Sequence, residues 1–182
     1  MESLYNTKFT SYQAAQAACD AIARTQGFAL AIRTKKPNAA DPSYIHFRCS
    51  KGGRFVGISD EVIANSNAKR RKTNTQMTEC PYRLIMKLDR GIGTWSVSSA
   101  PAGSAHNHPF VAPMDHAKYR GEAISRYLDE IVQMYNSGTR PVHIAEQLRG
   151  RSHQDPDLEG ITATQIHNAL ARHRRDERDE AP

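Results

Sequence analysis

Cys49 ends the run Tyr44-Ile45-His46-Phe47-Arg48-Cys49, and Cys80 opens the run Cys80-Pro81-Tyr82-Arg83-Leu84-Ile85-Met86-Lys87-Leu88. Both runs have the composition of strands. A third run around Trp95-Ser96-Val97 leads through a short loop to Ala105-His106-Asn107-His108. The residues between Asp89 and Gly93 read as the turn of a hairpin. These runs predict a small antiparallel sheet with two cysteines and two histidines close to its strands.

Two thiols and a His-x-His pair supply four ligands, the number that a tetrahedral zinc ion needs. The two-residue spacing of His106 and His108 places them on the same side of an extended chain. His46 lies three residues before Cys49 on one strand, so it is expected to point to the opposite face. Four protein ligands leave no open coordination position, which favours a structural ion over a catalytic one. We therefore expect one structural zinc ion on Cys49, Cys80, His106 and His108; the alternative is a pair of solvent-exposed histidines in a loop.

The order of these motifs resembles a known superfamily of zinc-binding, DNA-reading domains. The resemblance rests on Cys49, a long loop, Cys80-Pro81-x-Arg83, Trp95-x-Val97 and His106-Asn107-His108. That superfamily includes the plant WRKY domains, the glial-cells-missing domains and the far-red-impaired-response (FAR) domains, which are shared with Mutator-like transposases. The FAR branch is the most similar, because of the basic insert between the cysteines and the opening Phe9-Thr10-Ser11-x-x-x-Ala15. The resemblance covers roughly residues 8 to 110 and implies that a β-strand enters the major groove of duplex DNA.

The same resemblance suggests which residues read bases. Residues 28 to 33 alternate Phe28, Leu30 and Ile32 with small or basic residues, which predicts a half-buried strand followed by a basic turn over residues 34 to 38. Gln26-Gly27-Phe28 occupies the place of the D-G-Y entry of WRKY domains, although the tryptophan and tyrosine of the WRKY signature are absent. Arg33, Lys35 and Lys36 are therefore expected to contact bases; the alternative is a solvent-facing strand end that carries lysines.

Further basic residues lie between the two cysteines. Lys51 and Arg54 follow Cys49 directly, and a polar run farther on contains Lys69, Arg70, Arg71 and Lys72. Such a polar run cannot pack a core, so we expect a mobile loop. Four successive basic residues suit phosphate contacts, a nuclear localisation signal, or both; a solvated charge run is the alternative.

The charge of the chain is unevenly distributed. The net charge is +6, but residues 1 to 114 hold 15 Lys/Arg against 7 Asp/Glu, a net charge of +8. Residues 115 to 182 hold 10 against 12, a net charge of −2. A basic half is the electrostatic footprint of a phosphate-backbone partner. The number of cysteines, three, is odd, and two of them are assigned to the metal site, so a disulfide scaffold is not expected and a reducing compartment fits. We expect a nuclear protein.

The fold class expected from these patterns is α+β, with two domains. The first, residues 8 to 112, combines the zinc-bearing sheet with an N-terminal helix from Ser11 to Arg24, in which Cys19 is a buried core residue. The second, residues 116 to 176, contains helices at 117 to 136, at 141 to 149 and from Thr162 onward. Thr162 and Gln165 form a capping box, with Ile161 and Ile166 as a hydrophobic staple.

Three short helices suggest a helix-turn-helix, but the connection over residues 150 to 161 is longer than its usual turn. A bundle for interaction or homodimerisation is the alternative, and similar helices follow the zinc domain in Mutator-like transposases. The 68 residues after residue 114 are too few for a transposase catalytic domain, so no enzyme activity and no small-molecule substrate are expected. No apolar run is long enough for a membrane span.

Two functions follow from these observations. The first is a sequence-specific duplex-DNA-binding protein, either a transcription regulator or one derived from a transposase. The second is a zinc-stabilised interaction adaptor or effector that does not bind DNA.

Overall fold

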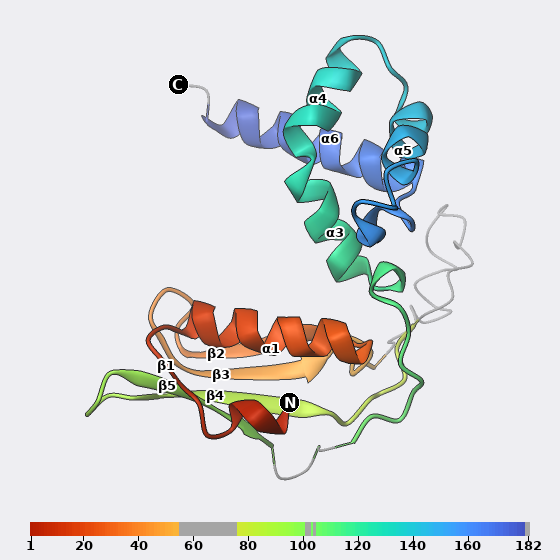
Figure 1. Cartoon of the computed structure of the whole chain (residues 1–182). Coiled ribbons are helices and arrows are strands. Elements are labelled where there is room, and N and C mark those ends of the chain that lie inside the picture. Colours follow the sequence, from red (N-terminus) through yellow and green to blue (C-terminus); the bar gives the residue numbers. More distant parts are fainter. Residues whose placement is uncertain (55–75, 101–102, 104, 181–182) are drawn as a thin grey trace, which may run out of the picture. The chain divides into compact units, whose positions relative to one another are not determined.

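The chain divides into two compact units, Met1–Phe110 and Val111–Pro182. The computed structural model describes residues 1–54, 76–100, 103 and 105–180 (Figure 1). Unit 1 contains an antiparallel sheet with a long N-terminal helix, and unit 2 is helical. The α+β fold class expected from the sequence is therefore confirmed.

Within the described residues, the sheet of unit 1 has five strands in the order β1-β5-β4-β3-β2, and all neighbours are antiparallel. The strands are β1 (Lys8–Phe9), β2 (Leu30–Pro37), β3 (Pro42–Cys49), β4 (Arg83–Asp89) and β5 (Thr94–Ser99). The β4–β5 hairpin expected from the sequence is present, with Asp89 opposite Thr94. This order leaves β2 at one edge of the sheet.

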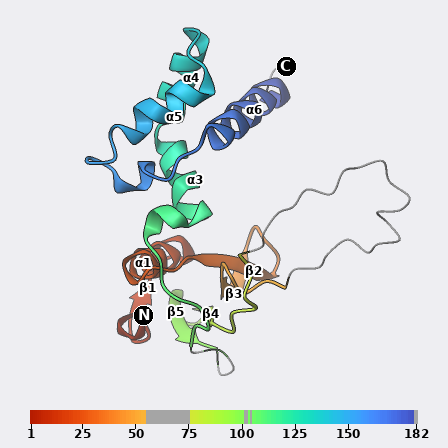
Figure 2. The same ribbon diagram turned by 90° about the vertical axis from the view of Figure 1, so that its right-hand side faces the viewer.

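Helix α1 (Tyr12–Gln26) covers one face of the sheet, as Figures 1 and 2 show. Ser11 caps the helix by accepting a hydrogen bond from the backbone N–H of Ala14 at 3.1 Å. Gly27 ends it in the left-handed conformation, with φ of 80°, which a residue without Cβ adopts at little cost. Cys19 is fully buried in the middle of the helix, in agreement with its expected place in the core.

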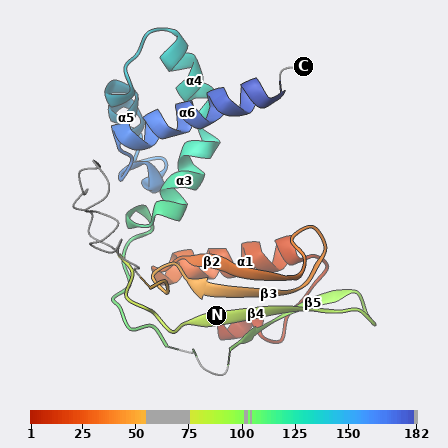
Figure 3. The same cartoon turned by 180° about the vertical axis from the view of Figure 1, so that it is seen from behind.

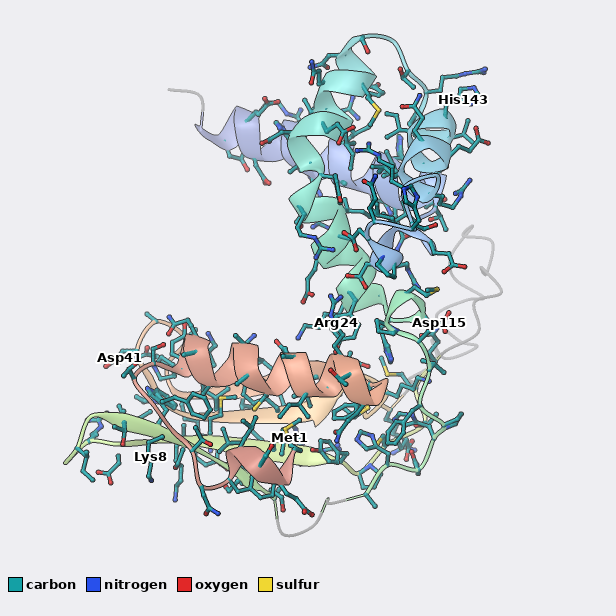
Figure 4. All side chains as sticks on the ribbon, viewed as in Figure 1. Met1, Lys8, Arg24, Asp41, Asp115 and His143 are labelled. Atoms are coloured by element: carbon teal, nitrogen blue, oxygen red, sulfur yellow. The ribbon has the colours of Figure 1, made fainter. Side chains whose placement is uncertain are left out.

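The core of unit 1 lies between α1 and the sheet. Strand alternation directs one set of side chains toward the helix: Ile45 and Phe47 from β3, Leu84 and Met86 from β4, and Trp95 and Val97 from β5. The ring of Trp95 meets that of Tyr12 edge-on, at 5.7 Å between centroids. The short helix η1 (Glu2–Leu4) also adds partly buried apolar side chains to this core (Met1 is labelled in Figure 4).

The basic turn expected over residues 34 to 38 is not a turn. Strand β2 continues to Pro37, and Lys35 pairs with Ile45 of β3. The chain reverses instead between Asn38 and Asp41, where the Asn38 side chain accepts from the backbone N–H of Asp41 at 2.7 Å (Asp41 is labelled in Figure 4). Pairing with β3 decides this boundary, because exposed lysines are compatible with an edge strand.

The described residues of unit 2 form four α-helices and two short 3₁₀ helices. They are η2 (Pro113–Asp115), α3 (Ala117–Arg126), α4 (Leu128–Asn136), α5 (Pro141–Arg149), η3 (Pro156–Leu158) and α6 (Ala163–Glu180). Helix α6 packs against α3, α4 and α5 (Figure 3). Buried apolar side chains from all four helices form a core that is separate from that of unit 1.

The single helix expected over residues 117 to 136 is wrong, because α3 and α4 are separated at Tyr127. Its φ of −104° and ψ of 12° lie outside the helical range. The predicted capping box is confirmed: the backbone N–H of Gln165 donates to Thr162 Oγ1 at 3.3 Å, and that of Thr162 donates to Gln165 Oε1 at 3.0 Å. No helix in the described part of the chain is long and apolar enough to cross a membrane.

The two separate cores predict that unit 1 folds without unit 2. A chain that ends at Ala112 keeps every core residue of unit 1, including the partly buried apolar side chains packed on it. We expect this shortened chain to unfold in one cooperative transition and to bind the same one equivalent of metal that we expect for the full chain. Circular dichroism with metal titration measures both. Loss of metal binding or of the transition would show that the units share stabilising contacts.

Candidate metal centre

The side chains of Cys49, Cys80, His106 and His108 converge in unit 1, and their ligand atoms all lie within 4.8 Å of one another. Cys49 Sγ lies 3.2 Å from His108 Nε2, and Cys80 Sγ lies 3.4 Å from His106 Nδ1. The two imidazole nitrogens are 3.2 Å apart. Both cysteines are fully buried. The structure thus brings together the four ligands named from the sequence, and they could hold one metal ion.

Three of the six ligand–ligand separations already match a tetrahedral ion, while the whole set extends to 4.8 Å. Ligand bonds of about 2.0–2.1 Å to nitrogen and about 2.3 Å to sulfur imply tetrahedron edges of about 3.3 Å between nitrogens and about 3.5 Å between nitrogen and sulfur. The nitrogen–nitrogen separation of 3.2 Å and the sulfur–nitrogen separations of 3.2 and 3.4 Å lie close to those edges. Two thiolates with two imidazoles form the soft and borderline donor set that zinc takes in structural sites.

The two imidazoles are oriented by different surroundings. His108 Nδ1 lies 2.9 Å from the carbonyl oxygen of Pro109, to which it donates. This hydrogen bond fixes the tautomer that leaves Nε2 free to bind a metal. His106 is held by aromatic rings instead. Its ring stacks on that of Tyr82, with 4.1 Å between centroids, and the centroids of Phe28 and Phe110 lie 4.4 Å and 5.2 Å away. The aromatic contacts of the site therefore include Phe110, which lies after the His-x-His motif in the chain.

Two glycines let the ligand-bearing loops approach closely. A Cβ on Gly52 would lie 2.8 Å from the carbonyl oxygen of Cys80 and 2.9 Å from that of Cys49. A Cβ on Gly103 would lie 2.1 Å from the carbonyl oxygen of Pro81. Real Cβ atoms do not reach such distances, so these positions require residues without side chains. The two glycines therefore leave room for the segment after Cys49 and for the backbone at Gly103 to lie directly against the segment around Cys80.

Two polar side chains tie the same segments together. The guanidinium of Arg83 donates from Nη1 to the carbonyl oxygens of Cys80 at 2.6 Å and Tyr82 at 2.8 Å. Asn107, the central residue of His106-Asn107-His108, donates to the carbonyl oxygen of Thr78 at 2.8 Å and accepts from Thr78 Oγ1 at 3.0 Å. The asparagine thus fixes the histidine pair to the residues just before Cys80, a role that the sequence did not reveal.

Burial sets the proton state of the site. Desolvation raises the pKa of the Cys49 thiol to about 11, although a backbone hydrogen bond from Lys51 opposes this shift. Desolvation, with a smaller effect from His108, lowers the pKa of His106 to about 4. Without a metal, the Cys49 thiol is therefore protonated and His106 is neutral at pH 7. A bound ion needs the thiolate, so binding must release the Cys49 proton.

The other candidate residues lie outside this cluster. His46 is on the face of the sheet away from α1, as expected, and burial together with Arg33 and Arg83 lowers its pKa. Lys51 and Arg54 follow Cys49, where Arg54 lies 3.7 Å from Glu79. Arg33, Lys35 and Lys36 lie within β2. Lys69, Arg70, Arg71 and Lys72 lie outside the described residues.

Comparisons of the chain with protein-family models, with curated proteins and with solved structures give no match. The candidate site therefore rests on its own geometry.

Removal of one ligand should abolish tight metal binding. Cys80→Ala and His108→Ala each leave three ligands, so we expect at least a 100-fold loss of Zn²⁺ affinity and a lower melting temperature, because metal binding is coupled to folding. Metal analysis and thermal unfolding measure these effects. Cys19→Ala is the matched control, since it removes a buried thiol from α1 and should keep one equivalent of metal. Full metal content in either ligand variant would mean that the site is misassigned.

Asn107→Ala tests the orienting contact separately. It keeps all four ligands but removes both hydrogen bonds to Thr78. Loss of a hydrogen bond that orients a metal ligand typically lowers metal affinity by about 10- to 100-fold. We expect a loss in that range with the stoichiometry unchanged at one ion. An unchanged affinity would show that the histidine pair is held by the aromatic rings alone.

Metal binding should depend on pH in a defined direction. The pKa of Cys49 is raised to about 11, so affinity should rise between pH 6 and pH 8 as the proton becomes easier to remove. The pKa of His106 in the folded chain, about 4, lies below the value of about 6.5 for a free histidine. The folded state therefore binds fewer protons in this window, and the metal-free protein should lose stability as the pH falls from 6.5 toward 4. Calorimetry in two buffers and unfolding at several pH values test both trends.

Proposed function

We propose that unit 1 is a duplex-DNA-binding domain stabilised by one structural zinc ion. The donor set of two cysteines and two histidines supports zinc, and four protein ligands leave no position for a substrate. This zinc domain would have no catalytic role. The resemblance to FAR and WRKY domains, which is carried by the sequence motifs alone, supports duplex DNA as the partner.

The observation that carries the proposal is the charge on the sheet face away from α1. Strand alternation puts five basic side chains on this face: Lys8, Lys36, Arg48, Arg83 and Lys87. Arg33, at a register shift of β2, is close enough to His46 to lower its pKa. Among these strand positions one acid, Asp89, is present, and its carboxylate accepts from the backbone N–H of Gly91 at 3.0 Å.

Such a surface suits a phosphate backbone. Lys8, Lys36 and Lys87 are exposed on this face, whereas Arg48 and Arg83 are half-buried. Exposed cationic side chains repel one another, and a polyanion relieves this repulsion while it releases its own counterions. Arg83 has an additional consequence, because its guanidinium also holds the backbone of Cys80 and Tyr82. The basic face and the metal loops are therefore mechanically linked through one side chain.

Strand β2 is the element best placed to reach bases. It is an edge strand, and the major groove admits strands as well as helices. Arg33 and Lys36 are exposed on it, whereas the ammonium of Lys35 lies 4.8 Å over the ring of Tyr12 in α1. The three basic residues grouped by the sequence therefore have different surroundings. Arg33 and Lys36 are the proposed base or phosphate contacts, and Lys35 is the one that packs on the helix.

The second candidate function is protein interaction, and the same edge favours it. An exposed edge strand presents unpaired backbone groups to which an extended peptide can add as a further strand. An adaptor of this kind would use the backbone of β2 and little of the basic face. A nuclear location and a role as a transcription regulator or transposase-derived protein belong to the DNA proposal, and neither requires enzyme activity.

DNA binding by unit 1 should be electrostatic and selective. If about five phosphates are neutralised, a plot of the logarithm of the affinity against the logarithm of the salt concentration should have a slope of about −4 to −5. Arg33→Ala and Lys36→Ala should each weaken binding to a preferred duplex by about 1–3 kcal/mol if they contact bases, and should change non-specific binding less. Selection from random duplex DNA followed by affinity measurements at several salt concentrations tests this.

Lys35→Ala is the matched control in the same strand. It removes the same charge as Lys36→Ala but from the side of β2 that faces Tyr12, so it should change sequence preference less. Replacement of Lys69, Arg70, Arg71 and Lys72 by alanine should weaken binding to all DNA sequences alike and reduce the magnitude of the salt slope. An affinity of the parent chain that does not respond to salt would favour the adaptor function instead.

A further inference from the structure

Helix α6 presents a polar, basic face to solvent in unit 2. The exposed side chains recur every three to four residues and share one side of the helix: Thr164, His167, Asn168, Arg172 and Arg175. Between Ala163 and Arg175 the helix contains three arginines and no acidic residue, because its acids begin at Asp176. The part of α6 before Asp176 therefore combines hydrogen-bonding side chains with positive charge at its C-terminal end.

The opposite side of α6 is fixed in the core of unit 2. Ile166 and Leu170 are buried among apolar side chains from α3, α4 and α5. The start of the helix is held by its capping box and by Arg149 of α5, which donates to the carbonyl oxygen of Ile161 at 2.8 Å. The exposed face is consequently displayed by a rigid element whose rotation about its own axis is set by packing.

The long connection between α5 and α6 is anchored at several points. Arg126 of α3 lies 2.7 Å from Asp155 and 3.1 Å from the buried Asp157. Arg151 forms an ion pair with Glu130 of α4, and Leu158 is fully buried. The length of this segment argued from the sequence against a helix-turn-helix. The anchored connection removes that objection, because it packs on the helices and leaves the face of α6 exposed.

The composition of this face favours a polyanion over a second copy of the chain. Dimer interfaces have apolar cores from which charged residues are depleted. The apolar residues of α6 are used inside unit 2, and the large apolar side chains exposed on the described part of this unit are Tyr135, at 36%, and Val142, at 43%. Arg and Asn are the side chains that make paired hydrogen bonds to guanine and adenine, respectively.

We propose that the exposed face of α6 is a second duplex-DNA contact, which enters the major groove with Thr164, His167 and Asn168 toward base edges and with Arg172 and Arg175 toward guanine or phosphate. The fit is geometric as well as electrostatic: a helix is about 10–12 Å wide with its side chains, and the major groove is about 12 Å wide. This inference rests on the proposed function, because it names the same partner, but it uses residues of unit 2 alone.

The test uses the full zinc-loaded chain and the duplex selected from random DNA. Arg172→Ala combined with Arg175→Ala should reduce the magnitude of the salt slope by about 2 and weaken binding at least tenfold, since two cationic contacts are lost. His167→Ala combined with Asn168→Ala keeps the arginines, so it should leave the slope unchanged. It should reduce the preference for the selected duplex over a scrambled one by about 5- to 150-fold.

Arg174→Ala is the matched control on the same helix. Its guanidinium lies 5.7 Å over the ring of Tyr135 in α4 and its Nε donates to the carbonyl oxygen of Leu170, so both salt slope and preference should remain those of the parent. Thermal unfolding confirms that each variant is folded.

The possible results separate the two proposals. If all α6 variants bind as the parent does while Arg33→Ala loses affinity, the inference about α6 is overturned and the proposed function of unit 1 stands. A double-arginine variant that changes the molecular mass in solution but not DNA binding also overturns it, because the face would then be a dimer interface. If the parent chain binds no duplex, both proposals fail.

Discussion

Convergence of two buried thiols and two half-buried imidazoles in one small volume is the constraint on which unit 1 depends. Cys49 ends β3, Cys80 precedes β4, and the histidine pair follows β5. These segments are far apart in the chain, and each needs a specific path to reach the others. Gly52 and Gly103 allow the close approach, while Asn107 fixes the histidine pair to Thr78. A metal ion would close this arrangement and add stability to a core too small to be robust alone.

The same arrangement connects the metal to the surface. Arg83 holds the carbonyl oxygens of Cys80 and Tyr82 while it lies on the basic face of the sheet. Tyr82, in turn, stacks on His106. A change in the metal loops would therefore reach the basic face through adjacent residues. This coupling would give the proposed DNA-binding sheet a physical reason to carry a structural ion at one end.

The two units differ in how they present positive charge. In unit 1 the basic residues alternate along strands, so they spread over a sheet face. In unit 2 the exposed positive charge lies on α6. Most arginines elsewhere in this unit have partners inside it: Arg126 pairs with Asp155, and Arg149 donates to the carbonyl oxygen of Ile161. The net charge of −2 for residues 115 to 182 therefore conceals a basic face on α6. Overall charge is a poor guide where ion pairs neutralise part of it.

The sequence by itself determined the elements whose signals are local. The cap at Ser11, the glycine end of α1, the capping box of α6 and the α+β class follow from neighbouring residues. The four candidate ligands are distant in the chain, but their residue types and the His-x-His spacing made them recognisable. Tertiary structure decided what depends on distant partners. Pairing with β3 turned the expected basic turn into the end of β2, and packing in unit 2 separated α3 from α4. The contact of Lys35 with Tyr12 and the tie between Asn107 and Thr78 join residues more than 20 positions apart. No local pattern carries such information, since it arises only when the strands and helices pack.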